Sequence, residues 1–409
     1  MYVCGPTVYD YLHVGNARTM VIFDTVRRYL EYIDYEVSYV QNFTDIDDKI
    51  IARGDVSEKF LEEALTDMKG LNLLMGKTKN PRVTEEMEEI IEMIDVLIKK
   101  GNAYEVNGDV YFHVPSYEGY GALKKQDEHV SRLEENSLKK HSSDFALWKN
   151  AREGEPSFES PWGQGRPGWH IECSAMAKKY LGKTIDIHAG GIDLLFPHHE
   201  NEIAQSCCAN DADFANFFMH NEFVNINEEK MSKSLGNFFT IRDVAERYSY
   251  EIIRFFLLSS HYGSKMNFSD EAMKAASAGY ERIRNCIEAD GKNEEDFSEY
   301  RRRFEEAMED DFNTANAIAI IFELVSAVNK LDARPSLVIE LCEILGINFK
   351  FSEYKASINE MDIKDFIEQR EQAKKNKDFA LADKIRNDLK EQGITLIDTR
   401  EGTKYKYES

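Results

Sequence analysis

A segment near the middle of the chain carries the side chains best suited to binding phosphate. Its residues, Lys230-Met231-Ser232-Lys233-Ser234, combine two lysines and two serines with little bulk. The ammonium groups of Lys230 and Lys233 can neutralise the charge that builds on a triphosphate as pyrophosphate leaves, and such charge stabilisation is usually the largest catalytic contribution. We therefore predict a mobile phosphate clamp; the alternative is a solvated lysine turn.

A second motif, His13-Val14-Gly15-Asn16, lies where a strand ends and a helix is expected to begin. A helix N-terminus presents free backbone N–H groups and the positive end of the helix dipole to an anion. Gly15 allows close approach of an adenine ring or a phosphate, and His13 and Asn16 can donate hydrogen bonds to phosphate oxygens. Alone, the motif is better explained as a plain helix start. Together with the lysine–serine segment, it indicates an enzyme that activates a carboxylate with ATP.

Four further side chains are candidate metal ligands: Cys4, Cys173, His198 and Glu202. Pro197 favours a helix that begins there, which would place His198 and Glu202 on one face. Cysteine sulfur together with imidazole suits zinc. By spacing alone the site is weak, because no CxxC pair exists and the ligands span nearly the whole first half of the chain. Buried free cysteines and a polar helix start remain the alternative.

The elements that must position these groups begin with a buried strand at residues 1–4. A helix is expected over residues 17–33, because apolar side chains recur there at helical spacing. Residues 37–41 alternate and are rich in β-branched side chains, which predicts a second parallel strand. Strand, loop, helix and strand in this order start a doubly wound sheet, whose ligands bind at the carboxyl ends of the strands.

The remaining sequence changes character twice. Residues 108–165 hold Gly, Ser and Pro clusters and short strands, which we interpret as an insertion between two halves of the sheet. From residue 241 onward the patterns are almost all helical. Further elements are expected as follows: helices at 84–100, 272–289, 304–331 and 337–345, strands at 110–114, 185–188 and 217–224, and a final unit of two helices over 363–392, broken at 376–378, with a hairpin at 394–398 and 404–407.

The fold class that follows is α/β. We predict a doubly wound, parallel-sheet (Rossmann-like) catalytic domain with an insertion, followed by an all-helical bundle and a small C-terminal α+β unit. The expected parts are 1–107 (first half of the catalytic fold), 108–165 (inserted connective segment), 166–228 (second half, with the metal ligands), 229–268 (signature-loop region), 269–350 (helical bundle) and 351–409 (C-terminal unit).

Composition narrows the functional classes. Of the 409 residues 42% are hydrophobic, which allows a sizeable core, and no apolar run approaches the length of a membrane span. The six cysteines are few and scattered, as expected for reduced thiols in a cytoplasm. The net charge of −23 argues against broad, nonspecific affinity for nucleic acid. Residues 363–409 are the exception, with eleven Lys/Arg against ten Asp/Glu, so a polyanion is tolerated best there.

The pairing of the lysine–serine and histidine–glycine motifs resembles the class I aminoacyl-tRNA synthetases. Asn16 departs from the usual second histidine of the family but keeps a hydrogen-bond donor. The resemblance sharpens to the cysteinyl-tRNA synthetase family and runs over essentially the whole chain. The matching segments are 2–10, 42–49, 165–174, 188–193 and 196–206.

The resemblance implies an activity and its cofactors. It implies activation of L-cysteine by ATP with Mg²⁺, transfer to tRNA(Cys), and one Zn²⁺ held by the four candidate ligands with the substrate thiolate. The carboxylate of an amino acid is already a nucleophile, so positioning for in-line attack replaces a general base. The further residues implied are Gly5, Gly191, Asp193 and Val224 at the adenosine, Thr7 and Thr44 at the amino group, Trp169 over the side chain, and His188 lining the pocket.

The same resemblance assigns the late helices to the tRNA stem and the C-terminal unit to the anticodon. A basic run and nearby aromatic residues could contact splayed bases there: Arg370, Lys374, Lys375, Lys377, Lys384, Arg386, Phe379, Tyr405 and Tyr407. We expect a monomeric, cytoplasmic enzyme that binds no membrane. Two alternatives stay open: a ligase that joins cysteine to a glucosaminyl-inositol in mycothiol synthesis, and a non-catalytic, zinc-dependent RNA-binding relative.

Overall fold

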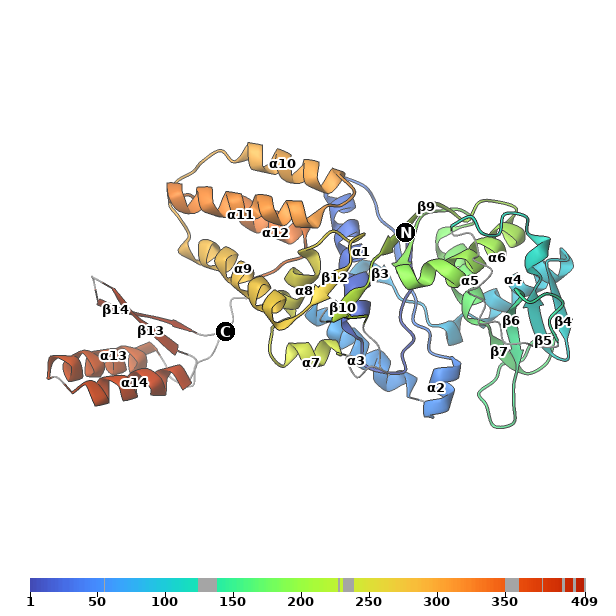
Figure 1. Cartoon of the computed structure of the whole chain (residues 1–409), viewed down its shortest axis with the longest axis horizontal. Helices are drawn as coiled ribbons and strands as arrows, with labels where there is room; N and C mark the ends of the chain where they lie inside the picture. The colour runs from blue at the N-terminus through green and yellow to red at the C-terminus, as the bar shows by residue number, and fades with distance from the viewer. Residues whose placement is uncertain are drawn as a thin grey trace. The chain divides into compact units, whose positions relative to one another are not determined.

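The computed structural model describes residues 1–54, 56–123, 138–226, 229–230, 239–349, 360–376, 378–391, 394–399 and 402–407. The chain forms two compact units, Met1–Asn348 and Phe349–Ser409 (Figure 1). The first unit contains every element that positions the candidate site, and the second unit is described on its own below.

A parallel sheet forms the centre of the first unit. Its strands are β1 (Tyr2–Val3), β2 (Tyr39–Gln41), β3 (Thr78–Lys79), β8 (Ile185–Gly191) and β9 (Ala215–Asn221). Their order is β3-β2-β1-β8-β9, and all neighbouring pairs are parallel. The chain moves outward from β1 on one side and later returns to its other side, so the doubly wound prediction is confirmed. The crevice beside β1 is where such sheets bind ligands.

Helix α1 (Val14–Tyr32) follows β1 and packs its apolar face on the sheet. It begins three residues earlier than the predicted start at residue 17. The reason is the side chain of His13, which accepts a hydrogen bond from the backbone N–H of Asn16 and so caps the first turn. Histidine is not among the residue types preferred at this position, so the start of the helix carries no ordinary capping signal.

Five further helices complete the two halves of the catalytic fold. They are α2 (Asp48–Arg53), α3 (Ser57–Gly70), α4 (Met87–Lys99), α5 (Trp169–Leu181) and α6 (Glu200–Asn210). Helices α4, α5 and α6 pack against one another, and α4 contributes Ile90, Met93, Ile94 and Leu97 to the core at helical spacing. The predicted helix 84–100 is shorter at its front, because Val83–Glu85 forms a separate 3₁₀ turn. Helices α2, α3 and α5 were not predicted.

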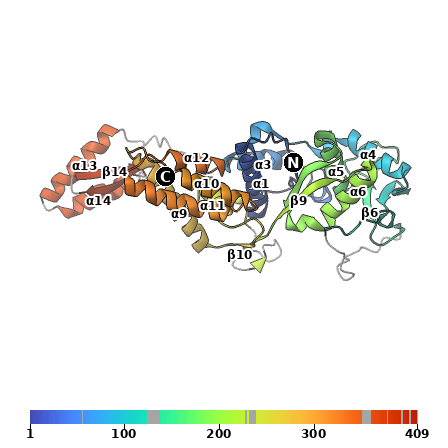
Figure 2. The same cartoon turned by 90° about the horizontal axis from the view of Figure 1, so that it is seen from above.

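A four-stranded antiparallel sheet lies between the two halves in the sequence. It contains β4 (Ala103–Val106), β5 (Asp109–Phe112), β6 (Phe145–Asn150) and β7 (Gly165–Pro167), in that order. Asn107 and Gly108 both have positive φ, at 55° and 86°, as a two-residue hairpin turn requires. Gly108, the predicted start of the insertion, therefore lies in the first turn of this sheet. Figures 1 and 2 place the sheet at the opposite end of the first unit from the helical bundle.

The region after β9 forms a small three-stranded sheet and two helices. Strand β10 (Val224–Ile226) pairs with β11 (Glu229–Lys230) and with β12 (Met266–Phe268). Helices α7 (Ile241–Ala245) and α8 (Tyr250–Leu258) lie between β11 and β12 in the sequence. The predicted strand 217–224 is thus two strands, because the chain leaves the parallel sheet at Asn221 and joins another at Val224.

Four helices form the bundle that ends the first unit: α9 (Asp270–Ala289), α10 (Ser298–Glu309), α11 (Thr314–Leu331) and α12 (Ser336–Ile344). The prediction of one helix over 304–331 is wrong. Asp311 and Phe312 have positive φ, at 53° and 52°, and the side chain of Asn313 caps a new helix by accepting from the N–H of Asn316. Short polar side chains at this break favour local hydrogen bonds over a continued helix.

Helix α11 also corrects an expectation from composition. Among the helices in the described part of the chain, it is the one long and apolar enough to cross a membrane, whereas no such run was expected. It packs against α9, α10 and α12, and Ile318, Ile321, Leu324 and Val328 are buried there. Its apolar character therefore fits a core helix of the bundle.

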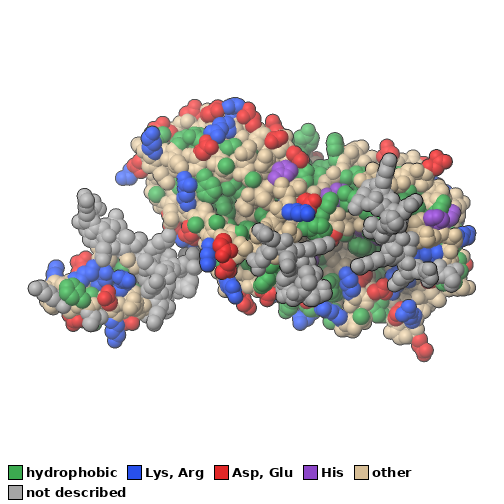
Figure 3. Space-filling view, in the orientation of Figure 1, with side chains coloured by type: hydrophobic (Ala, Val, Ile, Leu, Met, Phe, Trp, Pro, Cys, Tyr) green, Lys and Arg blue, Asp and Glu red, His purple; other side chains and the backbone are tan. Residues whose placement is uncertain are grey.

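The second unit contains two helices and a hairpin, as predicted. Helices α13 (Glu360–Lys375) and α14 (Phe379–Glu391) pack on each other, and β13 (Ile394–Thr399) pairs antiparallel with β14 (Gly402–Tyr407). Figure 3 shows Lys and Arg side chains beside exposed hydrophobic side chains on this unit.

Candidate active site and metal cluster

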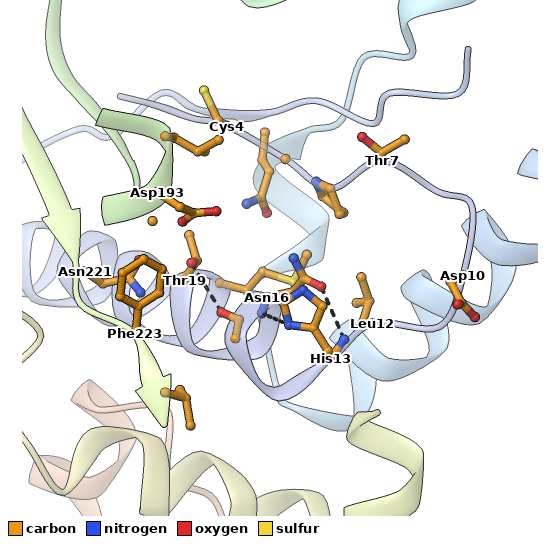
Figure 4. A pocket seen from close by; sticks show the side chains of 18 of the residues that line it. Cys4, Thr7, Asp10, Leu12, His13, Asn16, Thr19, Asp193, Asn221 and Phe223 are labelled. Carbon is orange, nitrogen blue, oxygen red and sulfur yellow. Dashed lines mark hydrogen bonds between the residues drawn. The ribbon is translucent and has the colours of Figure 1, made fainter. Parts of the chain in front are cut away.

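A cavity of about 430 Å³ opens at the carboxyl ends of β1 and β8, beside the start of α1 (Figure 4). Residues 4–13 supply one wall, the end of β8 supplies another, and residues 221–224 close a third. Ten of the predicted site residues line it: Cys4, Gly5, Thr7, His13, Gly15, Asn16, Trp169, Gly191, Asp193 and Val224. The cavity thus gathers residues from segments more than 200 positions apart in the sequence.

The absence of a side chain at Gly5 has a steric explanation. A Cβ atom on Gly5 would lie 1.6 Å from the carbonyl oxygen of Asn42, at the end of the neighbouring strand β2. The N–H of Gly5 donates to the side-chain oxygen of Asn42 at 2.9 Å. The two strand ends are therefore held in close approach next to the cavity, and only glycine allows it.

The start of α1 fixes the hydrogen-bonding character of His13 and Asn16. Nδ1 of His13 accepts from the N–H of Asn16, and Oδ1 of Asn16 accepts from the N–H of His13, both at 3.2 Å. A neutral imidazole whose Nδ1 accepts must carry its proton on Nε2. The cap uses Nδ1 of His13 and Oδ1 of Asn16 as acceptors, and the other polar side-chain atoms, Nε2 of His13 and the amide nitrogen of Asn16, are donors. Donors are what phosphate oxygens require.

The lysine–serine segment lies mostly outside the described residues. Met231, Ser232, Lys233 and Ser234 belong to the range 231–238, and of Lys230 the structure describes the backbone in β11. Both ends of this range adjoin described elements. Strand β11 pairs with β10, and after residue 238 the N–H of Ile241 donates to the carbonyl oxygen of Leu12 at 2.8 Å. The segment therefore ends beside the histidine–glycine motif, and it begins on a strand whose partner, β10, starts at the cavity residue Val224.

The four predicted metal ligands meet below the cavity. Their ligand atoms all lie within 4.8 Å of one another, and all four residues are buried. Sγ of Cys4 lies 3.9 Å from Sγ of Cys173 and 3.8 Å from Oε1 of Glu202, and Nε2 of His198 lies 3.8 Å from the same oxygen. Two sulfur ligands about 2.3 Å from one tetrahedral zinc ion would lie about 3.8 Å apart. The separations fit a single tetrahedral ion.

A second set of four possible metal ligands also contains Cys4 and Glu202, but its other two members are His188 and His199. It fits an ion less well. Nε2 of His188 lies 2.8 Å from Oε2 of Glu202, which is a hydrogen-bond distance, whereas a nitrogen and an oxygen on one tetrahedral zinc ion lie about 3.4 Å apart. The first set also offers two thiols, the ligands that favour zinc most strongly. We therefore assign His188 to the support of Glu202.

The structure places His188, predicted to line the substrate pocket, behind Glu202. Its side chain is fully buried, and it does not line the cavity. A comparable partner stands behind His198, whose Nδ1 lies 2.8 Å from Nδ1 of His170. Hydrogen bonds of this kind fix the tautomer and the orientation of metal ligands.

The electrostatics of the cluster match a bound cation. Burial raises the pKa of the Cys4 thiol, and burial lowers the pKa of His198 to about 3. Burial also opposes ionisation of Glu202, but the neighbouring imidazoles of His188 and His198 prevail and its pKa is lowered. Among the described residues, the ion-pair partners of Glu202 are histidines alone. A buried carboxylate so placed is stabilised by a divalent ion.

Trp169 lies between the cluster and the cavity. It is the first residue of α5, is 41% exposed, and lines the cavity. Its ring centroid lies 4.3 Å from that of His198. The indole therefore stands at the mouth of the metal cluster, where it can cover a small side chain that reaches the ion.

Thr7 and Thr44 lie next to each other, but only Thr7 is accessible from the cavity. They pair as an isolated bridge, and Thr7 lines the cavity. Thr44 is buried and does not line it, and its hydroxyl donates to Oε2 of Glu172 at 2.9 Å. Burial raises the pKa of Glu172 well above its ordinary value. The predicted contact of Thr44 with the amino group therefore has a competing partner in this structure.

Several residues near the site were missed from the sequence. Asp10, Thr19, Lys49, Gln41 and Asn221 line the cavity, and His199 lies 2.8 Å from His220 behind the cluster. Asp10, Lys49 and His199 lie inside the segments that carried the family resemblance, which was the available signal. Thr19, Gln41 and Asn221 had none, because helix and strand positions facing a cavity look like ordinary packing positions.

The second unit presents only part of the predicted basic run. Lys375, Lys384, Arg386 and Phe379 are exposed, whereas Arg370 is buried. Arg370 is therefore a packing residue of this unit. Lys377 and the side chains of Tyr405 and Tyr407 lie outside what the structure describes.

Comparison with known proteins assigns the family. Residues 1–278 match the class I (C) tRNA synthetase catalytic domain, and residues 303–350 match the DALR domain. The cysteine–tRNA ligase of Clostridioides difficile (strain 630) is 49% identical over 99% of this chain and 95% of its own length, and that of Bacillus cereus (strain B4264) is 48% identical over 99% and 94%.

A solved structure supports the fold alone. Mycobacterium tuberculosis methionyl-tRNA synthetase in complex with methionyl-adenylate aligns over 84% of this chain and 89% of its own, with a TM-score of 0.58 and 15% identity. The family model and the two relatives together cover the catalytic fold and the C-terminal unit. The chain therefore belongs to the cysteine–tRNA ligase family of the class I aminoacyl-tRNA synthetases.

Proposed function

We propose that this chain activates L-cysteine with ATP to cysteinyl-adenylate and transfers the cysteinyl group to the 3′ end of tRNA(Cys). The observation that carries the proposal is the shared residue Cys4. Its thiol belongs to a two-thiol metal cluster, and the same residue lines the cavity at the start of α1. A site that selects sulfur thus adjoins a site built to bind a triphosphate.

The metal cluster would hold one Zn²⁺ through Cys4, Cys173, His198 and Glu202. Zinc supplies the selection, because it binds a thiolate and lowers the pKa of a thiol, whereas a serine hydroxyl stays protonated. Discrimination by shape alone would be poor, since cysteine and serine differ by one atom. The indole of Trp169 covers the bound side chain, and the hydroxyl of Thr7 accepts from the substrate ammonium group.

Activation needs positioning and charge stabilisation. The Nε2–H group of His13 and the side-chain amide of Asn16 donate hydrogen bonds to phosphate oxygens. Lys230 and Lys233, together with Mg²⁺, neutralise the charge of the leaving pyrophosphate. Met231, Ser232 and Ser234 complete this loop. Gly5, Gly191, Asp193 and Val224 bind the adenosine. The substrate carboxylate attacks the α-phosphate in line, so no residue is required as a general base.

The acceptor is tRNA(Cys), and we assign its anticodon to the second unit. The exposed Lys375, Lys384 and Arg386 can contact phosphates, and the exposed ring of Phe379 can stack on a base. A ligase that uses glucosaminyl-inositol has no need of such a unit, which argues against that alternative. Activity as a monomer in the cytoplasm stays a prediction.

Two assays test the proposal on zinc-loaded protein. Pyrophosphate exchange should depend on L-cysteine and should be negligible with L-serine. Charging should then yield product on tRNA(Cys) and none on glucosaminyl-inositol. Product on the sugar alone would replace the tRNA proposal with the mycothiol ligase, and absence of any cysteine-dependent exchange would favour the non-catalytic RNA-binding relative.

A further inference from the structure

A buried arginine on α1, Arg18, does not line the cavity, yet it joins the parts of the chain that carry both nucleotide motifs. It lies two residues after Asn16, and its side chain is fully buried. Nη1 donates to the carbonyl oxygens of Glu222 and Phe223, both at 2.9 Å. Nη2 donates to the segment 260–264, most closely to the carbonyl oxygen of Ser264 at 2.6 Å. One guanidinium therefore ties α1 to two separate stretches of backbone.

The charge of Arg18 makes these contacts obligatory. Burial lowers the pKa of Arg18 to about 10, so the group still carries its charge at pH 7. The two terminal nitrogens donate to backbone carbonyl oxygens and to the hydroxyl of Ser260. The carboxylate of Glu222 also favours the charged form, and together with these dipoles it stabilises the buried charge only while the segment 222–223 and the segment 260–264 stay in place. The arginine and the two backbone segments thus hold one another.

The segment that Arg18 holds leads directly to the lysine–serine loop. Phe223 precedes β10, and β10 pairs with β11 so that Asn225 lies opposite Lys230. The far end of the loop is attached to the start of α1 without an intermediary, because the N–H of Ile241 donates to the carbonyl oxygen of Leu12. Figure 4 shows Asn221 and Phe223 on the side of the cavity opposite Thr7 and Asp10. Both ends of the loop are therefore connected to the N-terminal part of α1. One end is connected directly by a backbone hydrogen bond, and the other is connected through the side chain of Arg18.

We propose that Arg18 is a positioning residue that sets the Lys230-bearing strand against the first turn of α1, so that adenylate formation depends on it although it touches no substrate. The inference rests on the proposed ATP-dependent activation. The planar fork of the guanidinium reaches two groups of carbonyls at once, which a single ammonium group does not do. A shift of about 1 Å in a catalytic group can cost on the order of 10²-fold in rate.

The test is Arg18→Lys in zinc-loaded enzyme, assayed by cysteine-dependent pyrophosphate exchange. The kcat should fall by about 10- to 100-fold, whereas the zinc content and the KM for cysteine should change by less than about twofold. The matched control is Arg27→Lys. Arg27 is also buried on α1 and also donates to a backbone carbonyl, that of Leu74 at 3.2 Å, but it does not hydrogen-bond to any of the described residues 222–226. It should lower thermal stability comparably and leave kcat nearly unchanged.

The outcomes separate the two proposals. Wild-type enzyme without exchange would overturn the proposed function. Normal wild-type exchange, with Arg18→Lys within about threefold of it, would overturn the positioning role alone, as would an equal loss of kcat in Arg27→Lys. Rates are normalised to zinc-bound, folded protein. Arg18→Gln, which keeps one amide donor, carries the same expectation if the lysine variant does not fold.

Discussion

The metal cluster and the nucleotide cavity share Cys4 but are built in opposite ways. The cluster takes its other ligands from α5, from the turn before α6 and from α6 itself, and all of them are buried. The cavity is bounded by connections between elements, and its lysine–serine loop is attached at both ends to neighbours of α1. Fixed ligand distances suit selection of one atom type, whereas a triphosphate must enter and pyrophosphate must leave.

This contrast implies that selection of cysteine and catalysis of its activation can be separated by mutation. Changes in the cluster should alter which amino acid is accepted. Changes around the cavity should alter how fast any accepted amino acid is activated. The four predictions below test this separation, beginning with the largest expected effect.

Cys173→Ser should abolish selection. The variant keeps the shape of the side chain but replaces a soft sulfur ligand by a hard hydroxyl, so the protein should no longer retain zinc after dialysis. Exchange with cysteine should fall by about 10³-fold or more, since a metal worth several kcal/mol is lost. Discrimination between cysteine and serine should vanish in what remains. Metal analysis and exchange assays with both amino acids measure these effects.

The control for this variant is Cys207→Ser, because Cys207 is half-buried on α6 and lies outside the cluster. It should keep zinc and activity. Tight zinc retention by Cys173→Ser would instead remove Cys173 from the ligand set and favour the set that contains His188 and His199.

Lys233→Ala should slow chemistry and leave binding intact. Loss of one charge at the leaving pyrophosphate should lower the rate of adenylate formation by about 10²- to 10³-fold. Cysteine affinity, which depends on the cluster, should be unchanged. Single-turnover kinetics and equilibrium cysteine binding measure the two quantities, with Lys330→Ala, an exposed lysine on α11, as the control. An equal loss of rate and affinity would contradict the separation.

His188→Asn should lower the affinity for zinc without abolishing zinc binding. His188 supports Glu202 through a 2.8 Å hydrogen bond, and loss of such a partner typically costs about 10- to 100-fold in metal affinity. Competition with a chelator measures this loss. The spectrum of the cobalt-substituted protein should still show two thiolate ligands, and His261→Asn, a partly exposed histidine remote from the cluster, should change neither quantity. A loss of thiolate bands would show that His188 does more than orient Glu202.

The sequence predicted the sheet and the bundle well because both depend on periodic burial. The helix break at Asp311–Phe312 was missed because an aromatic residue with positive φ has no sequence signal. The metal cluster depends on contacts between residues up to 198 positions apart, so spacing alone could not assemble Cys4 with Glu202, and family resemblance was needed. Local sequence patterns could not show that the side chain of His188 is buried away from the cavity, and they could not single out Arg18. The role of a buried polar residue depends on its hydrogen-bond partners, and those partners are known only once the fold is known.

The smallest effect concerns the two threonines that pair beyond the ends of the neighbouring strands β1 and β2. Thr7 lines the cavity, whereas the hydroxyl of Thr44 donates to buried Glu172. Thr7→Val should therefore weaken cysteine binding by about tenfold or more, because a hydrogen bond to a charged group contributes about 1.5–3 kcal/mol. Thr44→Val should leave cysteine affinity within about threefold of wild type, and it should lower the melting temperature by a few degrees because a buried carboxyl oxygen loses its donor.

Calorimetric titration of cysteine into zinc-loaded protein, paired with thermal unfolding, distinguishes the two threonines. A greater loss of affinity in Thr44→Val than in Thr7→Val would mean that the Thr44 hydroxyl leaves Glu172 when cysteine binds, as the family resemblance implies. The wall between cluster and cavity would then be remodelled by the substrate. Selection and activation would in that case be coupled through Glu172, whose neighbour in the sequence, Cys173, is a predicted zinc ligand.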